Sequence, residues 1–342
     1  MVTRIGIRDV ARATGLSITT VSHALSGKGR VSESTRDAVR AAAERLGYQP
    51  DPIAAGLASG RVGVIGILVE HVSSRHWEHT YRPYYAAFIS GATMLAVERD
   101  HAVVVLPTTL WGKVPLDGVI VVDPAHGDPI MAECRRRGKP VVADGKPLDL
   151  DFADVPVVES DSDRTLQTLL GRLRDSGASR IALLTGTEPD SYTLDTDKAY
   201  RSWSGTHGNP VIIEALQPGE NPAAAAERLL SRPDRPDAVH GLNETYGEAL
   251  LGAARRLGLS IPGDLLVTIM CETAEDKHWE VPLTVLSFEA ERRGAVAAAA
   301  LIDVLHGGEP GGLRVPTRLV IRESTDRPGT GGGAASERTV RE

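Results

Sequence analysis

Residues 7–60 read IRDVARATGLSITTVSHALSGKGRVSESTRDAVRAAAERLGYQPDPIAAGLASG, and this stretch predicts a small unit of three helices. Ile7, Val10 and Ala11 recur at helical spacing, so they predict the first helix. Gly15 follows them and suits the left-handed residue that ends many helices. Ser17 is then placed to cap a second helix, because its hydroxyl can accept a hydrogen bond from the first turn.

The second helix is polar on one side. Ile18, Val21 and Leu25 lie three and four residues apart, so we expect them to face inward. The side chains left to face outward are Thr19, Thr20, Ser22 and His23. Two helices joined by a turn with glycine form a helix-turn-helix, whose second helix enters the major groove of DNA. The pattern therefore predicts that these four side chains reach base edges.

The third helix and the charge pattern agree with a DNA-binding head. Ser32 is placed to cap a helix over about residues 33–46, which Gly47 ends. Residues 1–60 hold eight Lys and Arg against five Asp and Glu, a net charge of +3, whereas the whole chain carries −7. The remainder therefore carries −10. A basic end on an acidic body is expected where that end meets phosphates.

Residues 51–58 predict one further short helix. Asp51 suits an N-cap and Pro52 suits the first helical position. About six residues do not offset the cost of helix nucleation, so this helix should form only against a partner. The alternative is a plain interdomain linker.

The order and spacing of these residues resemble the LacI/GalR family of bacterial transcription repressors. The matching stretches are residues 7–11 (IRDVA), 15–17 (GLS), 20–22 (TVS), 31–32, 35–36, 42–43, 46–48 (LGY), Pro50 and 54–57. The TTVSH of residues 19–23 is similar to the purine-repressor subtype, whereas the commoner version has Arg in place of His23. The resemblance continues, more weakly, to about Thr325.

The resemblance implies a mechanism. A homodimer would place two recognition helices on palindromic double-stranded operator DNA. Paired hinge helices containing Ile53 and Ala54 would enter the minor groove, where Leu57 would act as the wedge between base pairs. A small-molecule effector bound between two lobes would control DNA binding by allostery, as inducer or as corepressor.

The body of the chain alternates strand-like and helical segments. Strand-like runs occur at 62–69, 102–106, 118–122, 140–143, 180–184, 210–213, 238–242 and 265–270, and helical stretches at 84–98, 128–137, 163–175, 222–230, 246–257 and 289–305. Alternation predicts an α/β fold with two parallel sheets covered by helices. It resembles the two-lobed periplasmic-binding-protein fold behind an all-α helix-turn-helix head.

We therefore expect four regions. They are a DNA-binding domain over 1–50, a hinge over 51–61, an effector-binding and dimerisation domain over 62–325, and a disordered Gly-rich tail over 326–342.

The effector site departs from the pattern of the family. Cys271 stands where a sugar-binding Asp is usual, and Thr196 where an Arg is usual. The residues expected near the effector are Arg75, Trp77, Tyr84, Tyr85, Asp161, Lys198, Asn243, Cys271 and Glu272. Losing charge-assisted partners disfavours a simple sugar. The extra residues 75–81 (RHWEHTY) suit an anionic or aromatic ligand.

Two alternatives remain open for this site. Asp161, Asn243, Lys198 and Glu272 could rebuild a sugar site by moving the contacts sideways. Trp77 and the two tyrosines could instead be a packed cover over the cleft, because aromatic side chains are more often core than ligand wall.

Other classes of function are disfavoured. The chain has no Walker-type glycine loop, no G-x-S-x-G elbow and no C-x-x-C or H-E-x-x-H motif, so we expect neither an enzyme nor a bound cofactor. His76 and His79 lack further ligands at fixed spacing, so we expect no metal site. A small-molecule binding protein with a vestigial DNA-binding head is the second hypothesis.

The composition predicts a cytoplasmic, nucleoid-associated protein. The chain has no apolar run of about 18 residues and no basic-then-apolar leader, so we expect no membrane span or secretion. Two cysteines, Cys134 and Cys271, suggest no disulfide framework, and we expect Cys271 to be a small buried residue.

Overall fold

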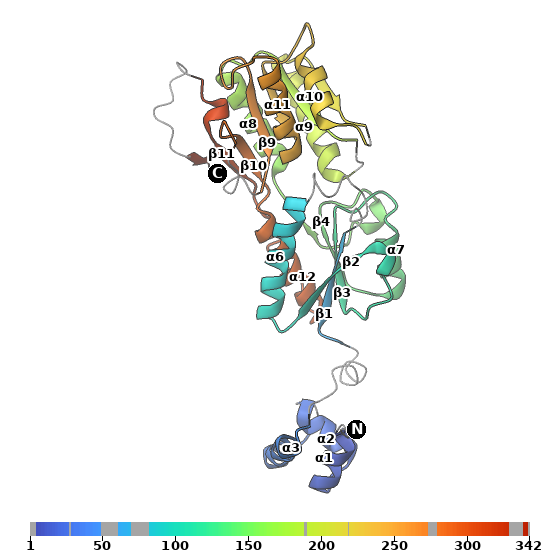
Figure 1. Ribbon diagram of the computed structural model, residues 1–342. Helices are drawn as coiled ribbons and strands as arrows, with labels where there is room; N and C mark the ends of the chain where they lie inside the picture. The colour runs from blue at the N-terminus through green and yellow to red at the C-terminus, as the bar shows by residue number, and fades with distance from the viewer. Residues whose placement is uncertain are drawn as a thin grey trace. The chain divides into compact units, whose positions relative to one another are not determined.

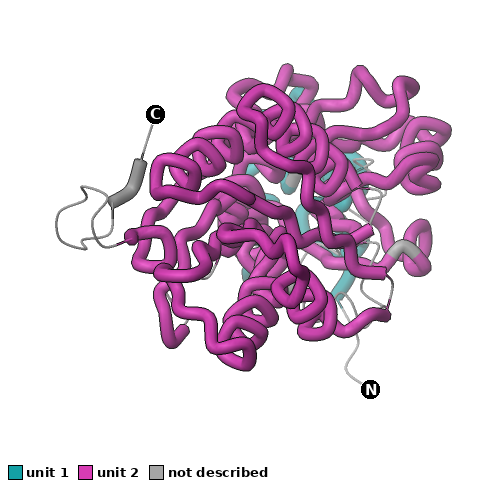
Figure 2. Tube along the Cα trace, turned by 90° about the horizontal axis from the view of Figure 1, so that it is seen from above, with its two compact units in different colours: residues 1–63 teal, residues 64–342 magenta. Residues whose placement is uncertain are grey.

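The computed structural model describes residues 5–26, 29–48, 61–69, 82–187, 190–217, 219–272, 279–327 and 338–340. The chain divides into two compact units, residues 1–63 and residues 64–342, coloured teal and magenta in Figure 2. The first unit holds the helical head, and the second holds both β-sheets.

The head consists of three helices, α1 (Ile7–Thr14), α2 (Ile18–Ser26) and α3 (Glu33–Leu46). Gly15 ends α1 with φ of +69°, a conformation that favours glycine. The Ser17 hydroxyl accepts from the Thr20 amide at 3.1 Å where α2 begins. The small apolar core is formed by Val10, Ala11, Val21, Ala24, Val39, Ala42 and Ala43. The predicted caps and turns of the head are therefore present.

A parallel sheet of five strands forms the first lobe of the second unit. The strands are β1 (Val64–Val69), β2 (Ala102–Pro107), β3 (Gly118–Val122), β4 (Val141–Asp144) and β5 (Val157–Val158), in the order β2-β1-β3-β4-β5. Helices α6 (Arg82–Glu98) and α12 (Ala290–Leu305) cover one face, and α7 (Pro129–Arg137) covers the other. Two short 3-10 turns, η1 (Thr108–Leu110) and η2 (Leu150–Phe152), complete this lobe.

The second lobe is built on a mostly parallel sheet. Its strands are β6 (Ile181–Thr185), β7 (Ile212–Ala215), β8 (Ala238–Gly241), β9 (Leu266–Met270), β10 (Thr284–Ser287), β11 (Arg318–Ile321) and β12 (Arg338–Val340), in the order β12-β11-β10-β9-β8-β6-β7. β11 pairs antiparallel with β10 and with β12, and the other described pairings in this sheet are parallel. Its helices are α8 (Ser162–Asp175), α9 (Ser191–His207), α10 (Pro222–Leu230) and α11 (Glu244–Arg256).

Helices α6 and α12 lie side by side in Figure 1 because two glycines allow their backbones to touch. A Cβ atom on Gly91 would lie 1.8 Å from the Glu291 carbonyl oxygen, and one on Gly294 would lie 1.9 Å from the Phe88 carbonyl oxygen. Both contacts involve backbone atoms that no rotamer change can move away. The first lobe thus holds α12, although α12 comes late in the sequence.

The chain passes between the two sheets three times. The first crossover is residues 159–161, between β5 and α8, and the second is residues 288–289, between β10 and α12. The third crossover, residues 306–317, leads from α12 to β11. The first and third run side by side, because the Glu159 amide donates to the Leu313 carbonyl at 3.0 Å and the Val315 amide donates to the Glu159 carbonyl at 2.9 Å.

The α/β fold class with an all-α head and a two-lobed core is confirmed, with differences in detail. The sequence missed α9, whose apolar residues lack a clear stripe. Residues Glu323–Thr325 form a 3-10 turn after β11. Within the tail predicted to be disordered, Arg338–Val340 pairs with β11 as β12. Among the described residues, no helix is long and apolar enough to span a membrane.

His240 generates a prediction about stability. It lies on β8, fully buried, with its Nδ1 atom 3.0 Å from the Thr268 hydroxyl. Burial disfavours the imidazolium and lowers the pKa of His240 from 6.5 to about 4. Between these two values the unfolded chain binds a proton that the folded chain does not. Stability is therefore lost as the pH falls from 6.5 to 4.

We predict that acidification to pH 4 costs the folded protein roughly 3 kcal/mol through this residue, as the pKa difference requires. His240→Asn should remove that part of the pH dependence of denaturant unfolding. His126→Asn, at an exposed position, is the control and should retain it. Equal pH slopes for wild type and His240→Asn would contradict the prediction.

Candidate nucleic-acid interface and effector cavity

The exposed face of α2 carries three of the side chains expected to meet DNA. It also carries Ile18, which was predicted to face the core of the head. Thr19 and His23 are exposed, and Ser22 is half-buried. Thr20 is half-buried, and its hydroxyl lies 2.8 Å from the hydroxyl of Ser17, the capping residue of α2. The Thr20 hydroxyl is therefore already engaged in a hydrogen bond. Ile18 is 45% exposed, contrary to the inward orientation predicted.

The reason for the difference at Ile18 is its place on the helix. It is the first residue of α2, whereas the core contacts of this helix begin one turn later at Val21 and continue at Ala24. The exposed face of α2 therefore offers an apolar group beside polar ones. The hinge residues Ile53, Ala54 and Leu57 lie outside the described residues.

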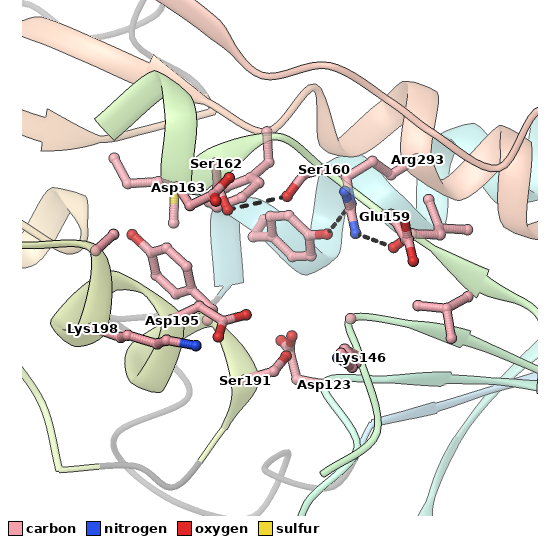
Figure 3. Close-up of a pocket in the computed structure, with 18 of the residues that line it drawn as sticks. Asp123, Lys146, Glu159, Ser160, Ser162, Asp163, Ser191, Asp195, Lys198 and Arg293 are labelled. Carbon is pink, nitrogen blue, oxygen red and sulfur yellow. Dashed lines mark hydrogen bonds between the residues drawn. The ribbon is translucent and has the colours of Figure 1, made fainter. Parts of the chain in front are cut away.

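A cavity of about 390 Å³ lies between the two lobes (Figure 3). Its polar lining comes from both: Asp123, Lys146, Glu159, Ser160, Ser162, Asp163, Gln167, Ser191, Asp195, Lys198, Ser202 and Arg293. Tyr84, Tyr192, Phe288 and Met270 supply apolar surface. Of the predicted effector residues, Tyr84 and Lys198 line this cavity, whereas Arg75 and Trp77 lie outside the described residues.

A buried ion pair holds the wall of the cavity on the side of the first lobe. Arg293 of α12 meets Asp144, at the end of β4, with 2.6 Å between Nη2 and Oδ1, and both side chains are almost fully buried. The Tyr84 hydroxyl donates to Asp144 Oδ2 at 2.5 Å, and Arg293 Nε lies 3.0 Å from the same hydroxyl. Arg293 also donates to the Val158 carbonyl at 2.8 Å. Its positive charge is thus balanced within the protein.

Asp123 lies on the same wall of the cavity and is crowded by other carboxylates. It follows β3 with φ of +49°, and the Tyr85 hydroxyl donates to its Oδ2 at 3.3 Å. Burial raises the pKa of Asp123 well above its usual range, and the nearby carboxylates Asp190 and Asp144 raise it further. A ligand that donates a hydrogen bond to this carboxyl would relieve that crowding. Tyr85 is itself part of the core and does not line the cavity.

Four of the residues predicted to contact the effector form hydrogen bonds within the protein, and none of the four lines the cavity. Asp161 accepts from the Thr317 amide at 2.7 Å and from its hydroxyl at 2.9 Å, which ties the first crossover to the third. Asn243 caps α11 by accepting from the Tyr246 amide at 2.9 Å. The buried Cys271 thiol donates to Glu244 at 2.9 Å.

Glu272 is the fourth, and it holds the second crossover. Its carboxylate accepts from the amides of Phe288 at 2.6 Å and Ala290 at 3.0 Å, and from the Ser287 hydroxyl at 3.0 Å. Burial raises the pKa of Glu272, and these donors oppose the rise. Glu272 was predicted to face the effector, but its carboxylate binds the backbone of the second crossover.

The sequence reasoning missed the acidic lining residues Asp123, Glu159, Asp163 and Asp195. One signal was available for Asp123, because it directly follows the buried strand GVIVV, and ligands of α/β folds sit at the carboxyl ends of strands. The others come from the first crossover and from α8 and α9. Among the described residues, no group of three His, Cys, Asp or Glu side chains is arranged to hold a metal ion, and His76 and His79 lie outside that range.

Two family models match the chain. The model of bacterial regulatory proteins of the lacI family matches residues 6–51, and that of a periplasmic binding protein-like domain matches residues 170–325. Similar proteins include the transcriptional regulator CelR of Thermobifida fusca, 27% identical over 92% of this chain and 96% of that protein. Catabolite control protein A of Priestia megaterium is 26% identical over 93% of this chain and 98% of its own length.

Solved structures share the fold. A complex of the transcriptional regulator CelR with cellobiose matches with a TM-score of 0.67 at 27% identity, covering 94% of this chain and all of that one. The Lac repressor dimer bound to operator matches with a TM-score of 0.76, covering 94% of this chain and 99% of that one. The second match, at 20% identity, shows a shared fold.

The position of Glu272 predicts a loss of stability on mutation. Glu272→Gln removes the charge and replaces one carboxylate oxygen by an NH₂ group, so either the Phe288 amide or the Ala290 amide loses its acceptor. We expect the free energy of unfolding to fall by about 1–3 kcal/mol. The control is Asp195→Asn, an exposed cavity residue, which should leave stability nearly unchanged. Equal denaturation midpoints for Glu272→Gln and Asp195→Asn would contradict the assigned role.

Proposed function

Since the chain belongs to the LacI family of bacterial transcriptional regulators, we propose that it binds a palindromic operator as a homodimer and that a small molecule in the interlobe cavity controls this binding. Membership of that family makes the chain a sequence-specific DNA-binding regulator and not an enzyme. We further propose a cytoplasmic, nucleoid-associated location, where its DNA partner would be, and no bound cofactor.

The exposed face of α2 supports the DNA-binding part of the proposal. Thr19, Ser22 and His23 offer hydrogen-bonding groups, and Ile18 adds an exposed apolar side chain to the same helix. Residues near the start of a recognition helix contact base edges, and an apolar side chain suits the methyl group of thymine. We therefore add Ile18 to the base-reading set. Thr20 keeps its proposed place, although its hydroxyl is engaged at the cap.

The hinge proposal rests on the sequence. Residues 51–58 begin with Asp51 and Pro52 and are too short to be stable as an isolated helix. Ile53, Ala54 and Leu57 would order on operator DNA, where Leu57 would wedge between base pairs.

The surface of α6 supports the homodimer. Met94 and Val97 lie three residues apart on this helix and are 61% and 62% exposed. Large apolar side chains gathered on one surface mark protein contacts. A second copy of the chain would cover them and present two heads to the two halves of a palindrome.

The cavity supports a ligand rich in hydrogen-bond donors. About 390 Å³ falls in the range of small-molecule sites. Four carboxylates, Asp123, Glu159, Asp163 and Asp195, line the cavity together with two lysines, Lys146 and Lys198. The charge of Arg293 is paired with Asp144, and only its Nη1 atom has no hydrogen-bond partner among the described residues. Carboxylates accept from hydroxyl and ammonium groups. The sequence predicted an anionic or aromatic effector, whereas the described lining favours a hydroxylated or amino-bearing one.

The aromatic side chains give that effector an apolar face. Tyr84 and Tyr192 both pack edge-to-face against Phe288, with ring centroids 6.3 Å and 5.0 Å apart. All three line the cavity. They offer the apolar face of a sugar-like ring a surface to lie on.

Base reading by His23 is the most direct test of the proposed function. We predict that His23→Arg changes the preferred half-site, by about 1–3 kcal/mol at the affected base pair, because the recognition helix then presents a different donor set. A randomised-operator selection on the full chain measures this change. If no sequence is selected by the wild type, the head is vestigial. If both proteins select the same sequence, His23 does not read bases.

The homodimer generates a second prediction. Met94→Glu places a charge in the proposed interface, so the sedimenting mass should halve at micromolar concentration. Operator affinity should then fall by about tenfold or more, because each half-site binds a separate chain. Val211→Glu, at an apolar residue 49% exposed on the second lobe, is the control and should stay dimeric. Sedimentation that does not distinguish the two variants would exclude the α6 interface.

The cavity generates a third prediction. Calorimetry of the full chain should detect binding among neutral disaccharides and amino sugars, and not among sugar phosphates. Asp195→Asn should weaken that binding about tenfold or more, because a charge-assisted hydrogen bond is lost. Asp175→Asn, exposed at the end of α8 and away from the cavity, should not. Tight binding of a sugar phosphate that depends on Lys198 would instead favour the anionic ligand.

A further inference from the structure

The ring of His23 lies against the loop that follows its own helix. If Gly29 carried a Cβ atom, that atom would lie 2.6 Å from His23 Nδ1, 3.0 Å from Cγ and 3.3 Å from Cε1. The Nδ1 edge of the imidazole therefore occupies the space that any other residue at position 29 would fill. Nε2 and Cδ2 lie on the other side of the ring. His23 remains exposed, so Nε2 is the nitrogen available to a base edge.

The loop itself is anchored to α3. The Arg36 guanidinium donates from Nη2 to the Gly29 carbonyl at 3.2 Å and from Nε to the Val31 carbonyl at 3.3 Å. The Val31 amide also donates to the Gly29 carbonyl at 3.2 Å. Arg36 belongs to a helix that is fixed by its buried Val39 and Ala42. The backbone at Gly29 is thus held in place, and the His23 ring is the part that can move.

We propose that Gly29 is a positioning residue for base recognition: its missing side chain lets the His23 ring fold against the loop and directs Nε2 toward the DNA. This inference rests on the proposed base-reading role of His23. A side chain at position 29 would displace the ring by rotating it about χ1, since an exposed imidazole is free to move and the anchored loop is not. The direction of Nε2, and with it the base preference, would change.

A substitution at Gly29 has a second effect that must be separated from the first. Gly29 has φ of +74°, so any L-residue is strained there whatever the space around it. Gly47, at the end of α3, supplies the matched control. It has φ of +67°, and a Cβ atom placed there meets nothing within 4 Å. Gly47→Ala therefore carries the backbone strain without the contact to His23.

The experiment compares operator preference among five forms of the full chain: wild type, Gly29→Ala, Gly47→Ala, His23→Ala and the double variant of Gly29 and His23. Relative affinities for every base at each half-site position come from a randomised-operator selection. We expect Gly29→Ala to change the preference by about fivefold or more at the position that His23→Ala also changes. Gly47→Ala should keep the wild-type preference, with any loss of affinity uniform across sequences.

The double variant gives the sharpest comparison. Once His23 is absent, adding Gly29→Ala should cause no further change in preference, because the two residues act through one ring. Gly29→Asn provides a second variant, since Asn tolerates the left-handed conformation better than Ala and still adds a Cβ atom. It should shift the preference at the same position if Gly29→Ala fails to fold.

The outcomes separate a failure of the positioning role of Gly29 from a failure of base reading by His23. If His23→Ala leaves the preference unchanged, base reading by His23 is wrong. If His23→Ala changes the preference while Gly29→Ala and Gly29→Asn behave like Gly47→Ala, base reading stands and the positioning role of Gly29 is overturned.

Discussion

The chain must leave one sheet and enter the other three times, and buried or half-buried carboxylates hold these crossovers together. Asp161 ties the first crossover to Thr317 in the third. Glu272 holds the second through the Phe288 and Ala290 amides. Arg318, the first residue of β11 after the third crossover, meets Glu289 of the second crossover at 2.6 Å. The segments that connect the two lobes are thus held by a few hydrogen bonds to carboxyl groups.

The first and second crossovers also form part of the cavity wall. Glu159, Ser160 and Phe288 belong to the crossovers and also line the cavity, so a ligand there contacts the segments that connect the lobes. Phe288 packs against Tyr84 of α6 on one side and Tyr192 of α9 on the other. A ligand that favours one orientation of the lobes would act on these segments first. This is the physical basis on which we propose that effector and operator are coupled.

The sequence predicted the head more closely than the cavity, because the head depends on local interactions. Gly15, Ser17 and Ser32 act within three or four residues of their own positions, so their roles are readable along the chain. Ile18 was misplaced because periodicity does not show where a neighbouring helix stops covering a face. Asp161 and Glu272 were expected near the effector. Their actual partners, Thr317 and the amides beyond β10, are set by tertiary packing.

The coupling between the two units is tested most directly by hydrogen exchange of the full chain with and without operator DNA, which requires no knowledge of the effector. Linkage is reciprocal, so if the crossovers respond to the effector and control DNA binding, DNA binding must also change the crossovers. We predict altered protection of amides at residues 159–162, 288–290 and 313–317 when operator is bound, in addition to protection in residues 5–48. Altered protection confined to residues 5–48 would contradict control of DNA binding through the crossovers.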